Sequence, residues 1–262
     1  MSNPAKVRLD VTNDGAVARV TLASPKANIL DRKMMLDLME SLNGLEWNRN
    51  PKVVVIGSEG PHFSFGASIE EHLPAQIGRT FVQLRELLRA LLLLPAPTIA
   101  AVRGQCLGGG FELALACDLI IAEETAQFAL PEIKLGLFPP AGAALLPVRI
   151  GASRAAEMVI TGTSTVATEA KAAGLVHRIA AAGDLEPALE RWLAADFLPR
   201  SDSALRYAAQ ASRRPLLHAV DDELPALEEL YLNGLMQQPD AVEGIIAFLE
   251  KRQPRWKLGP AA

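Results

Sequence analysis

The sequence predicts an α/β fold whose last third is mostly helical. In the first half, short continuous apolar runs that are typical of buried strands alternate with segments of helical spacing. From about residue 141 onward, nearly every segment has helical spacing. The chain of 262 residues is 50% hydrophobic and 21% charged, which suffices for a large core and excludes global disorder.

Six apolar or β-branched runs are expected to form strands. They cover residues 17–22, 53–56, 98–102, 119–122, 127–129 and 175–179. The first run follows the turn-like Asn13-Asp14-Gly15 and is expected to belong to a hairpin. Residues 57–68 and the glycine-rich residues 104–110 are expected to be loops, with a helix starting at Phe111.

Helices are expected between and after these strands. Asp31 is predicted to cap a helix that carries Met35, Leu38, Met39 and Leu42. The other helical segments are residues 75–94, 152–160, 168–173, 185–193, 203–212, 224–235 and 241–250. The best candidate boundary, near residues 195–203, predicts a core of residues 1–198 and a helical region of residues 199–262.

Charge and cysteine usage point to a protein that handles small molecules. The net charge of −4 lacks the cationic excess of a nucleic-acid-binding surface. Two scattered cysteines, no apolar leader and no long apolar stretch predict a soluble cytoplasmic protein without a membrane partner. The four histidines lack ligand spacing, so no metal is expected.

The most informative stretch is VRGQCLGGGFELALACD, residues 102–118. Three consecutive glycines, 108–110, allow close approach of a ligand, and the following helix N-terminus favours negative charge. The spacing matches neither a dinucleotide fingerprint nor a phosphate loop. An anion or oxyanion site remains, although a plain tight turn followed by a helix-start carboxylate, Glu112, would give the same pattern.

A second loop and a second carboxylate support the oxyanion interpretation. In FSFGASIEE, residues 63–71, the small pair Gly66-Ala67 could supply another free amide to the same oxygen. Glu132 follows Pro131 at the start of a short predicted helix. Alone it would be an ordinary helix-start residue, but with Glu112 it forms a pair suited to general acid and base catalysis.

These motifs resemble the enoyl-CoA hydratase/isomerase (crotonase) superfamily over nearly the whole chain. The resemblance rests on residues 100–118 with the GGGFE core, and on AQFALPEIKLG, residues 126–136. It extends to FSFGASI, to TGTSTVATEAKAAGLVHRI (161–179) and to EGIIAFLEKRQPRWK (243–257). It implies a crotonase-like spiral of ββα repeats carrying the acyl-CoA site, with a C-terminal helical region used for assembly into a homotrimer or a dimer of trimers.

The resemblance also implies roles for individual residues. The amides of Ala67 and Gly109 would form an oxyanion hole for a thioester oxygen, and Glu112 and Glu132 would be the catalytic pair of a hydratase. The residues expected to contact the acyl-CoA substrate are Lys26, Ala27, Gly66, Ser68, Ile69, Gly108, Pro131, Phe248 and Lys251. No cofactor is expected other than the coenzyme A of the substrate thioester.

Departures from the family pattern bear on the substrate. Residues 136–147 read GLFPPAGAALLP, where short-chain hydratases usually have GxxPGxGGTQRL, and Ser68 replaces a frequent Asp. Five side chains are candidates for an altered acyl pocket, although core packing is the better expectation for the two methionines: Met34, Met35, Phe65, His72 and Phe138.

Within the superfamily, PKANILD (25–31), HFSFGASIEEHLP (62–74), residues 102–116 and PEIKLGLFPPAG (131–142) are most similar to hydratases of a cyclic conjugated dienoyl-CoA. That resemblance implies water addition in the breakdown of aromatic compounds through benzoyl-CoA. The alternatives are straight-chain enoyl-CoA hydration, isomerisation, thioester hydrolysis, or a binding module without catalysis.

Overall fold

The computed structural model describes residues 5–24, 26–45 and 51–257. Pro25 of the PKANILD segment and both chain ends lie outside the described residues, and so do the expectations that fall on them. The main sheet has six strands in the order β1-β2-β3-β4-β6-β9. Its strands are β1 (Val7–Thr12), β2 (Val17–Leu22), β3 (Val53–Ser58), β4 (Thr98–Val102), β6 (Leu119–Glu123) and β9 (Arg178–Ala180). Only the β1–β2 hairpin is antiparallel within this sheet, so the predicted hairpin is confirmed.

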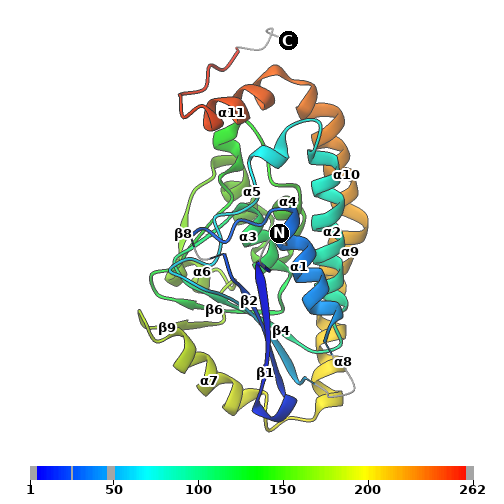
Figure 1. The fold of residues 1–262 in the computed structure, drawn as a ribbon, viewed down its shortest axis with the longest axis vertical. Coiled ribbons are helices and arrows are strands. Elements are labelled where there is room, and N and C mark those ends of the chain that lie inside the picture. Colours follow the sequence, from blue (N-terminus) through cyan, green and yellow to red (C-terminus); the bar gives the residue numbers. More distant parts are fainter. Residues whose placement is uncertain (1–4, 25, 46–50, 258–262) are drawn as a thin grey trace.

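Both faces of this sheet are covered by helices, which explains the continuous apolar runs. Alternate strand residues point to opposite faces. Val54 and Ile56 join the larger core with α1 (Arg32–Asn43) and α2 (Ile77–Leu93), whereas Val53 and Val55 pack against α7 (Leu185–Asp196). Figure 1 shows α7 on one side of the sheet and α1 on the other. Asp31 caps α1 as predicted, because its carboxylate accepts a hydrogen bond from the amide of Met34.

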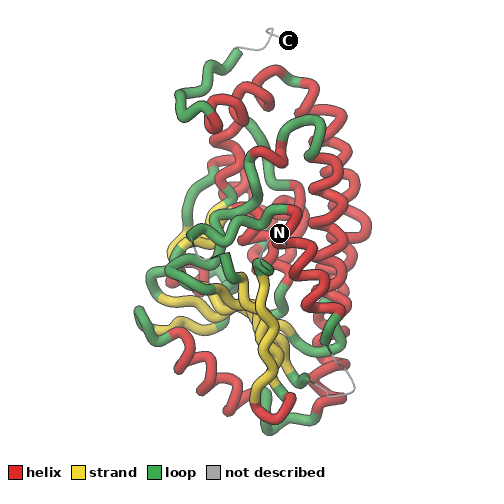
Figure 2. The backbone as a smooth tube through the Cα atoms, viewed as in Figure 1, coloured by secondary structure: helices red, strands yellow, loops and turns green. Residues whose placement is uncertain are grey.

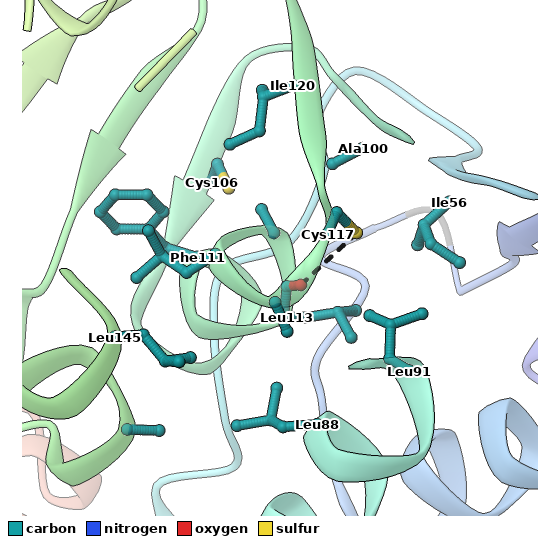
Figure 3. Close-up of a cluster of buried hydrophobic side chains, with 14 of the residues drawn as sticks. Ile56, Leu88, Leu91, Ala100, Cys106, Phe111, Leu113, Cys117, Ile120 and Leu145 are labelled. Atoms are coloured by element: carbon teal, nitrogen blue, oxygen red, sulfur yellow. Dashed lines mark hydrogen bonds between the residues drawn. The ribbon is translucent and has the colours of Figure 1, made fainter. Parts of the chain in front are cut away.

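A buried helix, α3 (Gly108–Ala116), runs through the larger core. Apolar side chains from the sheet and from α2 converge on it, including Ile56, Leu88 and Leu91 around Leu113 and Cys117 (Figure 3). The helix begins at Gly108 and not at Phe111, so that expectation was wrong. The amides of a first helical turn need no carbonyl partner within the helix, so glycines there do not prevent helix formation.

The predicted loop 104–110 also contains a strand, β5 (Gln105–Leu107). It pairs with β7 (Gln127–Ala129), and β7 pairs with β8 (Thr165–Val166), forming a second, small sheet. The strand expected over 175–179 is shorter and shifted to β9, because the amides of Leu175 and Val176 close a turn onto the carbonyl of Ala170. Their apolar character reports burial and not strand pairing.

Helices build the rest of the molecule, as predicted (Figure 2). They are α4 (Pro140–Ile150), α5 (Ala152–Thr161), α6 (Ala167–Ala172), α8 (Asp202–Ser212), α9 (Arg214–His218), α10 (Leu224–Glu229) and α11 (Pro239–Leu249), with the 3-10 helix η4 (Pro131–Leu135). The helix expected over 224–235 is interrupted by a π-helical turn, η6 (Leu230–Gly234), which apolar spacing does not reveal. In the described residues, no helix is long and apolar enough to cross a membrane.

A buried ion pair joins the C-terminal helices to the core. The Arg213 side chain is 1% exposed and donates to Asp118 and to carbonyls at the end of α2, among them that of Ala96. Asp118 in turn accepts from the amide and the hydroxyl of Thr98 in β4. The pair therefore fixes α9 against α2 and the sheet, and Figure 1 shows α9 and α10 alongside α2.

Candidate active site

The loop of residues 63–68 is held against the start of α3. The amide of Ser64 donates to the carbonyl of Gln105 at 3.0 Å, and the amide of Leu107 donates back to the carbonyl of Ser64 at 3.0 Å. The amide of Leu30 donates to the carbonyl of Gly66 at 2.9 Å. These backbone bonds place the Gly66-Ala67 pair beside the three glycines that open α3.

At this junction two backbone amides lie close together. A Cβ atom built on Gly109 would lie 3.3 Å from the backbone nitrogen of Ala67. Gly109 is in the first turn of α3, where amides lack an intrahelical carbonyl partner and the helix dipole is positive. The two predicted oxyanion-hole residues are therefore brought together, in a position suited to an electron-rich oxygen.

Glu112 is held by the N-terminus of another helix. Its side chain is buried, and the amide of Gly142 donates to Glu112 Oε1 at 2.7 Å. Pro140, which stands where short-chain hydratases usually have glycine, is the first residue of α4. The first turn of this helix supplies the Gly142 amide that binds Glu112. Burial raises the pKa of Glu112 to about 7, while the amides of Gly142 and Ala141 oppose the rise by stabilising the carboxylate.

Glu132 lies next to the same glycines. A Cβ on Gly108, whose φ is +47°, would lie 2.6 Å from Glu132 Oε1, so only glycine fits there without displacing the carboxyl group. Part of the residue reaches solvent, but Oε2 is buried and has no hydrogen-bond partner among the described residues. Burial, and then the charge of Glu112, raise the pKa of Glu132 to about 8.

These environments push the two carboxyl groups toward different roles. Backbone amides stabilise the charged form of Glu112, whereas nothing in its described surroundings donates to Glu132 Oε2. Two neighbouring carboxyl groups disfavour joint ionisation. Near neutral pH the arrangement therefore favours an ionised Glu112 and a protonated Glu132.

A cavity of about 780 Å³ opens beside Ala67 and Pro131, and neither Glu112 nor Glu132 is among its lining residues. Five of the predicted contact residues line it, namely Ala27, Ser68, Ile69, Pro131 and Phe248, together with Ala67 of the predicted oxyanion hole. Gly66, Gly108 and Gly109 are not among its lining residues, but Gly66 approaches Leu107 and Gly109 approaches Ala67, which both line it. Lys26 and Lys251 are exposed and do not line it. Lys134 and Arg252, which sequence reasoning did not assign to the site, do line it.

The five side chains that were candidates for the acyl pocket take different positions. Met34 and Met35 are buried in the larger core, as expected. Phe65 lines the cavity. The His72 ring donates from Nδ1 to the carbonyl of Ser68 at 2.7 Å and so braces the loop. Phe138 packs against Tyr231, a residue that sequence reasoning missed, with ring centroids 5.3 Å apart.

The geometry defines a class of enzyme in which two amides stabilise a developing oxyanion while carboxyl groups move protons. A sequence model of the enoyl-CoA hydratase/isomerase family matches residues 12–259, and the chain belongs to that family. The family and the relatives described next bear out the prediction of a hydratase-type lyase.

Two characterised relatives and one solved structure cover almost all of the chain. It is 41% identical to cyclohexa-1,5-dienecarbonyl-CoA hydratase of Thauera aromatica, over 98% of each chain. It is 37% identical to 2,3-dehydroadipyl-CoA hydratase of Escherichia coli, over 95% of this chain and 98% of that protein. The crystal structure of an enoyl-CoA hydratase from Mycobacterium avium subsp. paratuberculosis superimposes with a TM-score of 0.84 at 31% identity, over 97% of this chain and 99% of that one. The predicted crotonase-like α/β fold is thereby confirmed.

Proposed function

We propose that this enzyme adds water to cyclohexa-1,5-diene-1-carbonyl-CoA and forms 6-hydroxycyclohex-1-ene-1-carbonyl-CoA. The observation that carries the proposal is a pair of glutamates, the buried Glu112 and the partly buried Glu132, with differently stabilised carboxyl groups beside two converging amides. The choice of a cyclic diene is supported by the similarity to the Thauera aromatica hydratase.

In this proposal the thioester oxygen accepts hydrogen bonds from the amides of Ala67 and Gly109. Negative charge moves onto that oxygen when water attacks the conjugated system, and the two dipoles stabilise it without introducing an ion. Loss of one such donor typically lowers turnover by about 100-fold or more. The hydrogen bonds of the 63–68 loop keep the donors in place before substrate binds.

The glutamates divide the proton transfers. Ionised Glu112 orients water and removes its proton, so that hydroxide adds to the carbon β to the thioester. Protonated Glu132 supplies the proton that the far end of the conjugated diene takes up. One proton is taken from water and one is delivered to carbon, and the thioester leaves the cycle unchanged apart from the added water.

The outer part of the cavity is proposed to hold coenzyme A. Ala27, Ser68, Ile69, Pro131 and Phe248 line it and supply apolar contacts. The glycines 66 and 108 permit close approach of the thioester. Lys26 and Lys251 are exposed cations that we propose to contact the phosphate groups of the coenzyme. The mechanism requires no further cofactor.

Straight-chain hydration is the second candidate. The similarity to the 2,3-dehydroadipyl-CoA hydratase of Escherichia coli favours it, because the acyl group in that protein's name is linear. The segment from Pro139 into α4 departs from the pattern usual in short-chain hydratases, and its Gly142 amide donates to Glu112. This departure beside Glu112 favours the cyclic substrate.

The test is a product analysis of purified enzyme with the cyclic diene and with crotonyl-CoA in D2O. The proposal expects one added water on the diene, with deuterium at the far end of the former diene by NMR, and kcat/KM at least tenfold above that for crotonyl-CoA. A preference for crotonyl-CoA would make the enzyme a general hydratase. Loss of coenzyme A or a moved double bond without added water would make it a hydrolase or an isomerase.

Assembly, location and pathway belong to the same proposal. We propose a homotrimer or a dimer of trimers, so light scattering is expected to give three or six times the 28.1 kDa of one chain. A cytoplasmic location is supported by two unpaired, buried thiols, Cys106 and Cys117. The product would then enter the anaerobic degradation of benzoyl-CoA.

A further inference from the structure

Tyr231 places an unpartnered hydroxyl group deep in the molecule. It lies in the π-helical turn η6 of the C-terminal region and is 1% exposed. Its hydroxyl has no hydrogen-bond partner among the described residues. Buried hydroxyl groups in folded proteins normally have a partner, and those that lack one often bind a ligand. Single π turns are also frequent at functional sites.

The ring of Tyr231 is fixed by two aromatic neighbours. Phe81 packs edge-on, with centroids 4.8 Å apart and planes at 84°, and Phe138 lies at 5.3 Å. The remaining buried members of this cluster are apolar, namely Ile77, Leu137, Ala241 and Ile245. The hydroxyl is thus the polar end of an otherwise apolar group of side chains, and its direction is set by packing.

Tyr231 packs against the segment that follows Glu132. Its ring contacts Phe138, and Leu137 of the same cluster donates its amide to the carbonyl of Glu132 at 3.1 Å. The charges of Glu132 and Glu112 both add to burial in raising the pKa of Tyr231. The phenol therefore stays neutral throughout the working pH range, and it can both donate and accept a hydrogen bond. Its low acidity makes it a poor proton donor, which favours a role in holding a group in position.

Glu132 Oε2 is the second buried polar atom near this point that lacks a partner. A molecule that can both donate and accept, such as water or a hydroxyl group, satisfies both atoms whichever oxygen of Glu132 carries the proton. Resting on the hydration proposed above, we infer that the Tyr231 hydroxyl and Glu132 Oε2 together hold the water that Glu112 deprotonates and, after addition, the new hydroxyl group of the product. The C-terminal helical region thereby contributes a polar group to the reaction.

Loss of the Tyr231 hydroxyl is expected to lower kcat but to leave binding of the unsaturated substrate nearly unchanged. Tyr231→Phe keeps the ring contacts and removes only the hydroxyl, while Tyr207→Phe makes the same change at a side chain that is 73% exposed. We expect Tyr231→Phe to lower kcat by about 10- to 100-fold, the effect of one lost hydrogen bond to a charged or reacting group. KM stays within about threefold, and Tyr207→Phe matches the wild type.

Thermal unfolding distinguishes this role from a structural one. Because the hydroxyl has no partner among the residues that the structure describes, its removal is expected to leave Tm unchanged or higher. A kcat within twofold of the wild type would overturn the inference, and so would a loss of activity that follows a lower Tm.

A binding measurement tests Tyr231 independently of turnover. In the Glu112→Gln background, which blocks the reaction, calorimetry compares 6-hydroxycyclohex-1-ene-1-carbonyl-CoA with cyclohex-1-ene-1-carbonyl-CoA, which lacks the hydroxyl group. Adding Tyr231→Phe is expected to weaken only the hydroxylated ligand, by about fivefold or more. Equal effects on both ligands would refute the inference. If the wild type hydrates crotonyl-CoA but not the diene, the substrate proposal fails. The role of Tyr231 is then tested in the same way, by calorimetry with 3-hydroxybutyryl-CoA and with butyryl-CoA, which lacks the hydroxyl group.

Discussion

Adding one methyl group at Gly108 is expected to displace the carboxyl group of Glu132, the proposed proton donor, without unfolding the protein. In Gly108→Ala, the new Cβ would lie 2.6 Å from Glu132 Oε1, whereas ordinary contact begins at about 3.4 Å. The carboxyl group must therefore move by about 0.8 Å. Displacements of about 1 Å in a reacting group can lower turnover by about 100-fold, so we expect kcat to fall by one to two orders of magnitude.

The stability effect can be separated from the effect on catalysis. Gly108 has φ +47°, so alanine there also carries backbone strain of about 1–2 kcal/mol. Gly174 provides a matched control, because its φ is +84° and a Cβ there would meet nothing within 4 Å. We expect similar losses of unfolding free energy in urea for the two alanine variants, but loss of hydration only for Gly108→Ala. Activity of Gly108→Ala within twofold of Gly174→Ala would refute the reasoning.

Three further predictions concern charge, anchoring and binding. Burial raises the pKa of Glu132 to about 8, from about 4.5 in the unfolded chain, so the wild type loses stability as pH rises between these values. In urea, its free energy of unfolding is therefore expected to be lower at pH 9 than at pH 5, by on the order of a few kcal/mol. Glu132→Gln is expected to lack this decline, and an equal decline in both proteins would contradict the prediction. Asp118→Ala strands a buried arginine and is expected to cost about 3–5 kcal/mol in unfolding free energy, against less than about 1 for the exposed ion-pair variant Arg191→Ala. Phe248→Ala removes part of the cavity lining and is expected to raise KM about fivefold, with kcat within twofold of the wild type. Val11→Ala, at an exposed strand position, is the control and is expected to change neither value. An unchanged KM for Phe248→Ala would count against a contact between Phe248 and the substrate.

Most of the fold could be predicted because its signals are local. The strands over residues 17–22 and 98–102 are continuous apolar runs bounded by turn residues, and the structure has them at the same bounds. Asp31 caps a helix through a side-chain bond to a residue three positions away. Such features depend on neighbours in the chain, and a single sequence contains them.

The features that were missed depend on long-range contacts. The start of α3 at Gly108 requires the 63–68 loop to pack against glycines that lack a Cβ atom. Gly142 binds Glu112 from 30 positions away, although Pro139-Pro140 was a usable signal for a helix start. Tyr231 contacts Phe81 and Phe138 only because the C-terminal helices fold back along α2.

The candidate site was partly accessible from sequence for a similar reason. Motif resemblance selected the residues that converge in space, Ala67 with Gly109 and Gly108 with Glu132. Sequence alone could not tell the two glutamates apart, since both follow short helix-start motifs. Their difference comes from the α4 amide that only Glu112 receives.

In the proposed reaction, Glu112 and Glu132 jointly carry out the addition of water. The most direct measurement is kcat for Glu112→Gln and for Glu132→Gln on the preferred thioester, with affinity for a saturated acyl-CoA analogue measured in parallel by calorimetry. We expect each variant to lose about 100- to 10,000-fold in kcat while analogue affinity stays within about threefold. Retention of wild-type turnover by either variant would contradict it.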